Sequence, residues 1–174
     1  MEKKETTQKK RHPFRFLFRF IAKLAIIVGI GYVVLTYVMG VYRMTGNAMF
    51  PAVKDGDLCI TYKLDELHLN DVVFYNDEKG NRHMGRIVAM PGQVVDFPEN
   101  GGYLVNGMAP LEEVRYETYI DPSSDVEYPV TVPDGQYFVL NDMRDSTVDS
   151  RVFGCISKSD MNGKLIFVLR RRGF

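Results

Sequence analysis

The sequence is poor in the side chains that build metal sites and disulfide frameworks. It has two cysteines, Cys59 and Cys155, and three histidines, His12, His68 and His83, among 174 residues. Their spacing matches no zinc-binding pattern, so we expect no metal and no other cofactor. The spacing leaves two states of the cysteines open, one long-range disulfide or two separate buried thiols.

A long helical period is absent after residue 43, and so are internal repeats. Only residues 63–67 and 157–161 are compatible with a helical turn, the second with Ser157 as its N-cap. The remaining pattern consists of short runs of β-branched and aromatic residues, bounded by Asp, Gly, Asn and Pro. It predicts a mainly β domain of antiparallel or mixed sheets. The runs are DLCITYK, DVVFYND, RHMGRIVAM, QVVDF, GYLVNG, GQYFVLND and GKLIFVLR.

Charged side chains are absent from residues 24–42, which read LAIIVGIGYVVLTYVMGVY. A helix of this length extends about 28 Å and can cross the hydrocarbon core of a bilayer. Residues 1–23 carry eight Lys or Arg and two Glu, whereas the rest of the chain carries fourteen Lys or Arg and twenty Asp or Glu. Because basic residues beside a first span stay in the cytoplasm, the acidic body is expected outside the cell.

A cleaved secretory signal is the alternative interpretation of this N-terminus, because it also combines basic residues with an apolar stretch. The apolar run is longer than an ordinary signal needs, and no small-x-small cleavage site follows it. The expected organisation is a basic cytoplasmic segment 1–23, a single transmembrane helix 24–42 and an extracellular β domain 43–174, with 112–129 as an irregular insertion. We expect a cell-membrane protein that does not bind nucleic acid.

Four sequence blocks follow the apolar segment. Residues 46–51 read GNAMFP, 85–93 read GRIVAMPGQ, 103–111 read YLVNGMAPL and 141–151 read NDMRDSTVDSR. In order and spacing they resemble the type I signal peptidases, whose blocks are G-x-S-M-x-P, K-R-[VI]-[IV]-G-x-P-G-D, Y-[IV]-N-G-x-x-L and G-D-N-R-x-x-S-x-D-S-R. The resemblance runs to about residue 165 and implies a signal peptidase-like β fold behind one N-terminal transmembrane helix.

Both residues that the resembling family uses for catalysis are replaced here. The family's serine nucleophile falls on Ala48, and its general-base lysine falls on Gly85. Alanine has no atom that can attack a carbonyl, and glycine has no side chain that can accept a proton. Thr147, at the position of the family's helper serine, is an unactivated hydroxyl. The sequence therefore predicts a protein that is not an enzyme.

Two other side chains offer alternatives for the missing chemistry. His83 precedes Gly85 by two residues and would share its face of a strand, and Cys59 is a thiol in an apolar run. An exposed histidine beside a turn and an inert buried thiol are the simpler interpretations. Ala48 itself has an alternative explanation, because mutagenesis commonly places alanine at the position of a nucleophile. Gly85 argues against an otherwise intact peptidase.

The resemblance implies a groove in which an extended peptide lies between two segments, and such pairing needs no catalytic atom. We expect added charge in the groove, as in Gly85→Asp, to impair the biological role without unfolding the domain. The groove residues are Thr45, Gly46, Asn47, Ala48, Met49, Arg82, His83, Met84 and Gly85. The residues expected to support the groove, the charged ones through ion pairs, are Pro51, Arg86, Pro91, Gly92, Asp142, Arg144, Thr147, Asp149, Ser150 and Arg151.

Among Gram-positive homologues, the loss of both catalytic residues resembles the signal peptidase-like proteins of streptococcal pilus islands. This resemblance implies a non-catalytic chaperone or assembly factor in the cell membrane, with pilin subunits and a pilus sortase as partners. Two alternatives remain. One is a divergent signal peptidase that cleaves signal peptides, with residue 48 either natural or engineered, and the other is a scaffold or regulator of another secretion component.

Overall fold

The computed structural model describes residues 13–99, 101–110, 117–122 and 124–170, in a helical unit that ends at Tyr37 and a β unit that starts at Val38. The described part of the helical unit contains α1 (Pro13–Val33), which continues into a π-helix, η1 (Val34–Val38), whose last residue begins the β unit. Residues Phe14–Val38 are long and apolar enough to cross a membrane, and none of this segment is buried inside the protein. The helix therefore fits a single-pass anchor.

The helix lies earlier in the chain than the sequence indicated. We predicted residues 24–42, but helical structure ends at Val38, and Met39–Arg43 form the strand β1. Gly40 of β1 lies opposite Thr61, so the backbone hydrogen bonds of this apolar stretch belong to a sheet. Hydropathy alone does not separate an apolar strand from the apolar helix that precedes it. Of the predicted cytoplasmic segment 1–23, residues 1–12 carry most of the Lys and Arg, and they lie outside the described part.

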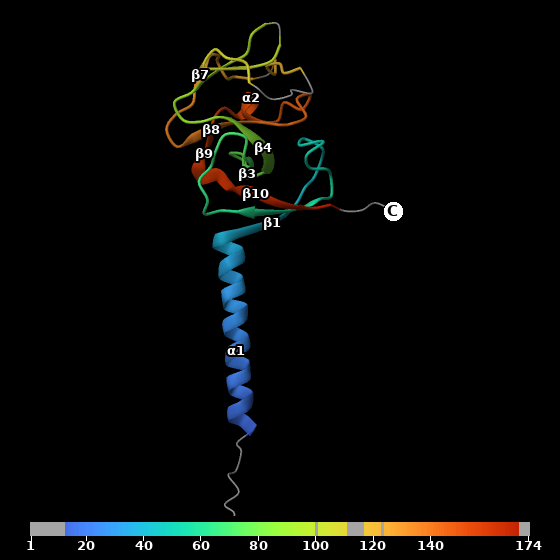
Figure 1. The fold of residues 1–174 in the computed structure, drawn as a ribbon, viewed down its shortest axis with the longest axis vertical. Helices are drawn as coiled ribbons and strands as arrows, with labels where there is room; N and C mark the ends of the chain where they lie inside the picture. Colours follow the sequence, from blue (N-terminus) through green and yellow to red (C-terminus); the bar gives the residue numbers. More distant parts are fainter. Residues whose placement is uncertain (1–12, 100, 111–116, 123, 171–174) are drawn as a thin grey trace, which may run out of the picture. The chain divides into compact units, whose positions relative to one another are not determined.

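The β unit contains a seven-stranded sheet of order β1-β2-β10-β3-β4-β8-β9 and a three-stranded sheet of order β6-β5-β7 (Figure 1). All pairings are antiparallel, which confirms the predicted fold class. The remaining strands are β2 (Leu58–Tyr62), β3 (Val72–Asn76), β4 (Arg82–Ala89), β5 (Val94–Asp96), β6 (Leu104–Val105), β7 (Val130–Thr131), β8 (Gln136–Leu140), β9 (Ile156–Ser157) and β10 (Met161–Leu169).

Every run predicted as a strand contains or overlaps one, namely β2, β3, β4, β5, β6, β8 and β10, although β10 begins two residues before its run. The turn at 157–161 is confirmed as a 3-10 helix, η2 (Lys158–Asp160), with Ser157 as its N-cap. The helical turn predicted at 63–67 is wrong, because these residues form bends and coil. A short helix, α2 (Ser150–Phe153), was not predicted. The described residues of the insertion 112–129 form no helix or strand.

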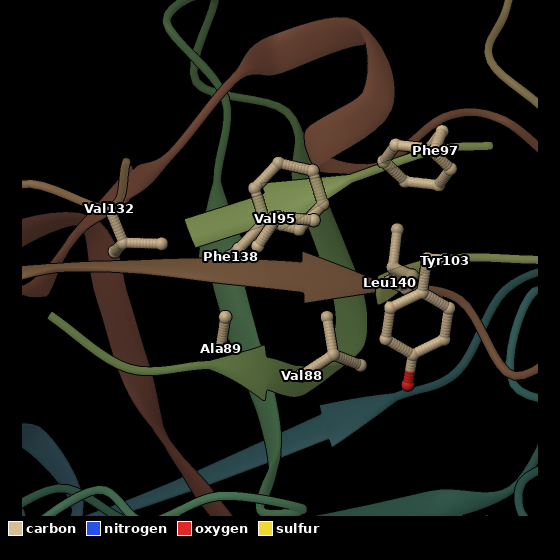
Figure 2. Packing of buried hydrophobic residues seen from close by; sticks show 8 residues of the cluster. All are labelled: Val88, Ala89, Val95, Phe97, Tyr103, Val132, Phe138 and Leu140. Carbon is tan, nitrogen blue, oxygen red and sulfur yellow. The ribbon is translucent and has the colours of Figure 1, made fainter. Parts of the chain in front are cut away.

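Three buried apolar clusters hold the β unit together. Figure 2 shows the first, in which Phe138 of β8 lies among Val88, Ala89, Val95 and other residues of β4, β5 and the loops that follow. The other two clusters cover opposite faces of β3 and β4, as the two-residue period of a strand requires. One contains Val73, Tyr75, Ile87 and Val139. The other contains Met44, Met49, Val53, Cys59, Phe74 and Met84.

Candidate peptide-binding pocket

A pocket of about 290 Å³ lies where the chain after β1 meets the first half of β4. Five of the nine predicted groove residues line it, from the segment after β1 and from β4. Six further lining residues were not predicted. The predicted five are Thr45, Ala48, Arg82, His83 and Met84, and the others are Arg43, Met44, Phe74, Asn141, Ser146 and Val148.

The first half of β4 has a free edge at this pocket. Along one edge, Arg82–Arg86 pair with β3, and along the other, β8 pairs with β4 only from Arg86 onward. Within the described chain no strand pairs with that second edge between Arg82 and Gly85. Such an edge presents unpaired N–H and C=O groups, and an extended peptide can add to it as a strand.

The loop before residue 48 is fixed by one aspartate. Gly46, which has a positive φ of 80°, donates its backbone N–H to Asp55 Oδ1 at 2.8 Å. The backbone N–H of Asp55 in turn lies 3.4 Å from Asn47 Oδ1. These contacts tie Gly46 and Asn47 to the loop, and neither residue lines the pocket. They hold the segment that leads to Ala48 in one path.

Ala48 lies at the pocket, and its neighbour Met49 does not. The backbone N–H of Met143 donates to the carbonyl oxygen of Ala48 at 2.9 Å, which joins this segment to the block 141–151. Met49 is fully buried and packs in the cluster of Phe74 and Met84. Met49 therefore anchors the segment from below rather than forming part of the groove surface.

Gly85 is buried and lies outside the pocket lining. A Cβ atom at this position would lie 2.5 Å from Cγ1 of Val139 and 3.2 Å from the carbonyl oxygen of Leu140. Tyr75 Cε1 would lie 3.5 Å away. Gly85→Asp would thus place a carboxylate in a filled apolar space, so the expectation that it leaves the fold intact is wrong.

The space around Gly85 is shared by a buried tyrosine. The Tyr75 hydroxyl has no hydrogen-bond partner among the described residues. Burial, together with the negative charge of Asp149, raises the pKa of Tyr75 far above its usual range. The phenol therefore stays neutral, and it fills apolar space beside the position of the family's lysine.

His83 is partly buried and paired, which corrects the interpretation of an exposed histidine. Its Nε2 lies 3.1 Å from Asp77 Oδ2, and its ring packs between Tyr75 and Phe153 at centroid distances of 5.6 and 5.0 Å. Because a carboxylate only accepts hydrogen bonds, Nε2 carries the proton of this contact. The side-chain amide of Asn81, more than His83, lowers the pKa of Asp77 to about 2.

The Asp77 turn gives the fold a defined pH dependence. Since the folded-state pKa is below the ordinary 3.8, this carboxylate stabilises the fold above about pH 4, and the contribution is lost as the pH falls towards 2. We expect Asp77→Asn to lower the free energy of unfolding at pH 5. The difference from the unmodified chain should close between about pH 4 and 2. Urea unfolding at matched pH measures it.

A matched control is Asp134→Asn, because Asp134 is exposed in the turn before β8. Its curve should follow that of the unmodified chain at every pH. A difference for Asp77→Asn that persists unchanged to pH 2 would show that its carboxylate charge is not what stabilises the turn.

A buried ion pair organises the block 141–151. Asp149 and Arg151 are both fully buried and form a two-pronged contact, Nε to Oδ1 at 2.9 Å and Nη2 to Oδ2 at 2.8 Å. Arg151 also donates to the carbonyl oxygens of Arg144 and Tyr119 and to that of Ser146. The carboxylate of Asp149 accepts the backbone N–H of Asn141 at 3.0 Å. The ion pair thereby positions Asn141 and Ser146, the two polar residues of this block that line the pocket.

A second ion pair joins this block to β4. Arg86 contacts Asp142 through Nε and Nη2 at 2.8 and 2.7 Å, and its Nη1 donates to the carbonyl oxygen of Asn70 at 2.9 Å. The guanidinium of Arg144 lies 5.1 Å from the centre of the Tyr103 ring. Both contacts hold the block against its neighbours, away from the pocket surface.

The other residues predicted to support the groove lie in turns and caps. Thr147 donates its hydroxyl to Asp121 and does not line the pocket. Ser150 Oγ accepts the backbone N–H of Val139 at 2.9 Å. Gly92, with a φ of 81°, follows Pro91 in a turn and donates its N–H to Val132. Pro51 lies in the turn that follows Ala48. Their supporting role stays a prediction.

Neither cysteine is paired or activated. Both thiols are free, and burial raises the pKa of each to about 11, with Asp57 adding to the shift at Cys59. Very little thiolate is present at neutral pH, so Cys59 is a packing residue rather than a nucleophile. Within the described ranges no group of three or more His, Cys, Asp or Glu is placed to hold a metal ion.

The pocket residues that sequence reasoning missed come from distant segments. Phe74 could have been found, because it lies directly opposite Met84 in the β3–β4 hairpin. Arg43 lies two residues before Thr45, the first predicted groove residue, but it directly follows the predicted transmembrane segment. Asn141, Ser146 and Val148 belong to a recognised block, yet only the folded chain brings that block to Ala48.

Comparison with known proteins gives one consistent family. The profile of the family described as "Signal peptidase, peptidase S26" matches residues 17–170. The chain is 28% identical to signal peptidase IB of Staphylococcus aureus (strain Mu50), with 87% of this chain and 88% of that protein covered. It is 29% identical to signal peptidase I of Bacillus licheniformis, with 97% and 94% covered.

A crystal structure of a signal peptidase I from Enterococcus faecalis V583 is also similar, with 25% sequence identity and a TM-score of 0.49. The match covers 59% of this chain and 98% of that one.

These relatives correct the expectation that the chain is not an enzyme. The family and the named relatives are signal peptidases, which are serine proteases. The prediction that the chain is not an enzyme is therefore wrong. The same names support a signal peptidase at least as well as the pilus-specific interpretation. Since Ala48 and Gly85 cannot supply the family's nucleophile and base, the question is which other pocket residues could supply them.

Proposed function

This chain belongs to the signal peptidase family, peptidase S26, and on that premise we propose that it is a divergent signal peptidase acting on exported precursors. The observation that carries the proposal is the free edge of β4 at a pocket that also contains Ala48. An extended precursor segment would pair with this edge through main-chain hydrogen bonds and place its side chains in the pocket.

The proposed membrane orientation places the N-terminus in the cytoplasm and the β unit outside the cell. Arg15, Arg19 and Lys23 lie in the N-terminal half of the helix, where basic residues favour the cytoplasmic side. In this orientation the pocket meets precursors after they have crossed the membrane.

The proposed chemistry uses pocket residues other than 48 and 85. Ser146 supplies a hydroxyl at the pocket, and Asn141 Nδ2 lies 3.3 Å from its Oγ. His83 supplies an imidazole whose Nε2 is paired with Asp77. No hydrogen bond joins Ser146 to His83 among the described residues, and such contacts commonly tighten only when substrate binds.

In the proposed reaction, the Ser146 hydroxyl attacks the scissile carbonyl carbon while His83 accepts the hydroxyl proton. The resulting imidazolium gives that proton to the leaving amine as the peptide C–N bond breaks. Water then attacks the acyl-enzyme, His83 again moves the proton, and the serine hydroxyl is restored. Asp77 stabilises the imidazolium in both steps.

Cleavage of precursors by the detergent-solubilised chain tests this reaction. We expect slow cleavage by the unmodified chain and a loss of about 100-fold or more in kcat/KM for Ser146→Ala and for His83→Gln. Ser159→Ala is the matched control, since Ser159 is exposed in η2. A pilin precursor and an unrelated exported precursor serve as the two substrates, because the resemblance to pilus-island proteins proposes pilin as the client.

The outcomes separate the parts of the proposal. Cleavage that survives both substitutions would assign the reaction to other groups. Absence of cleavage by the unmodified chain, measured alongside intact peptide binding, would refute the proposed reaction and leave the pocket as a binding site. Equal rates for the two precursors would exclude a preference for pilin.

A further inference from the structure

The pocket beside β4 carries positive charge that the described carboxylates do not neutralise. Arg43 and Arg82 both line it, and both are exposed. Neither guanidinium forms a salt bridge with a described residue. No lining residue is an acid, and the third ionisable one, His83, already faces Asp77. The pocket therefore lacks an anionic partner for two cations.

One of these arginines is held in position before any ligand arrives. The guanidinium of Arg82 lies 4.3 Å from the centre of the Tyr42 ring, and Tyr42 packs on Phe74 with ring centroids 4.9 Å apart. Stacking on an aromatic face orients a guanidinium and reduces the conformational entropy it loses on binding. Arg82 is also the first residue of the free edge of β4, so it marks the point where an added strand would begin.

Besides the two arginines, the lining contains both apolar and polar side chains. Met44, Phe74 and Met84 form its floor, and they belong to the buried cluster on that face of the sheet. Flexible Met side chains adapt to apolar groups of different shapes. The pocket thus combines adaptable apolar contact with an oriented guanidinium and a free strand edge.

We infer that this pocket selects extended peptides in which an Asp or Glu lies close to an apolar residue. Carboxylates match the planar donor fork of arginine, and the free edge of β4 supplies directional main-chain hydrogen bonds that a lipid phosphate would leave unused. The inference rests on the proposed peptide-binding function and adds the chemical class of its ligand.

Fluorescence anisotropy with the detergent-solubilised full chain tests the inference. Two labelled peptides share one sequence of alternating small and apolar residues and differ only in carrying Glu or Gln at two positions. We expect the Glu peptide to bind about tenfold more tightly at low salt, and the difference to shrink as salt is raised. Arg43→Gln and Arg82→Gln should each weaken binding of the Glu peptide about threefold to fivefold, and weaken binding of the Gln peptide less.

Lys158→Gln is the matched control, because Lys158 is an exposed cation in η2 and does not line the pocket. Equal binding of the two peptides would overturn the inference and keep the proposed function, whereas failure of both to bind would overturn both. Loss of affinity in Lys158→Gln as large as in Arg82→Gln would indicate attraction to net charge alone. Binding of short-chain phosphatidylglycerol that depends on Arg82, without binding of the Glu peptide, would assign the pocket to a lipid headgroup.

Discussion

Arg151→Met is expected to lower the free energy of unfolding by about 3–5 kcal/mol, because it leaves the charge of Asp149 buried without its partner. Both side chains are fully buried. The substitution also removes the donors that hold the carbonyl oxygens of Arg144, Tyr119 and Ser146. Urea unfolding of the detergent-solubilised chain, followed by far-UV circular dichroism, measures the loss.

Two control variants show whether the unpaired charge causes the effect. Asp149→Asn combined with Arg151→Met removes both charges and keeps an oxygen for the backbone N–H of Asn141, so it should be more stable than Arg151→Met alone. Lys164→Met breaks the pairs with Asp65 and Asp71, which lie near the surface, and should cost much less. If the double variant is no more stable than Arg151→Met, then lost packing, rather than the unpaired charge of Asp149, causes the loss of stability.

Restoring the family's lysine at residue 85 is expected to fail unless Val139 is shortened. Gly85→Lys should lower the free energy of unfolding by about 1–3 kcal/mol through overpacking, since its Cβ would meet Val139 Cγ1 at 2.5 Å. Val139→Ala removes that methyl group. The two substitutions should therefore be non-additive, with a favourable coupling of about 0.5–3 kcal/mol in a double-mutant cycle.

The same cycle has a catalytic readout in chains that carry Ala48→Ser. A Ser146→Ala background ensures that any cleavage reports the restored serine and lysine. We expect Ala48→Ser with Gly85→Lys to cleave a precursor poorly, and addition of Val139→Ala to raise kcat/KM by about 100-fold or more. If the chain without Val139→Ala cleaves equally well, the space beside Gly85 is more adaptable than its contacts indicate.

The strands were predictable because their cause is local. Alternating β-branched and aromatic residues between turn residues placed β2, β3, β4 and β8, and the four blocks located the segments that build the pocket. The strands β7 and β9, of two residues each, leave no period in the sequence, whereas the equally short β6 was found from the longer run GYLVNG around it. The strand β1 was hidden by the apolar helix before it.

Burial at residue 85 depends on a contact that no local pattern contains. Gly85 falls at the position of the family's lysine, so the resemblance indicated a groove position. Val139 and Leu140, on a strand more than fifty residues later, close the space above it. In the same way, Arg43 and Arg82 come to one pocket only through the folded sheet. Sequence reasoning therefore located the pocket, but it predicted neither the charge of the pocket nor the burial of Gly85.

The place of β10 between β2 and β3 has a consequence for the order of folding. This strand pairs with β2 on one side and β3 on the other, although β2 and β3 lie about a hundred residues before it in the chain. Until it arrives, β2 and β3 each keep an open edge, and the sheet is divided into two incomplete halves. The β unit therefore completes its sheet only when residues 161–169 are available to pair, and until then the two open edges are exposed to other chains.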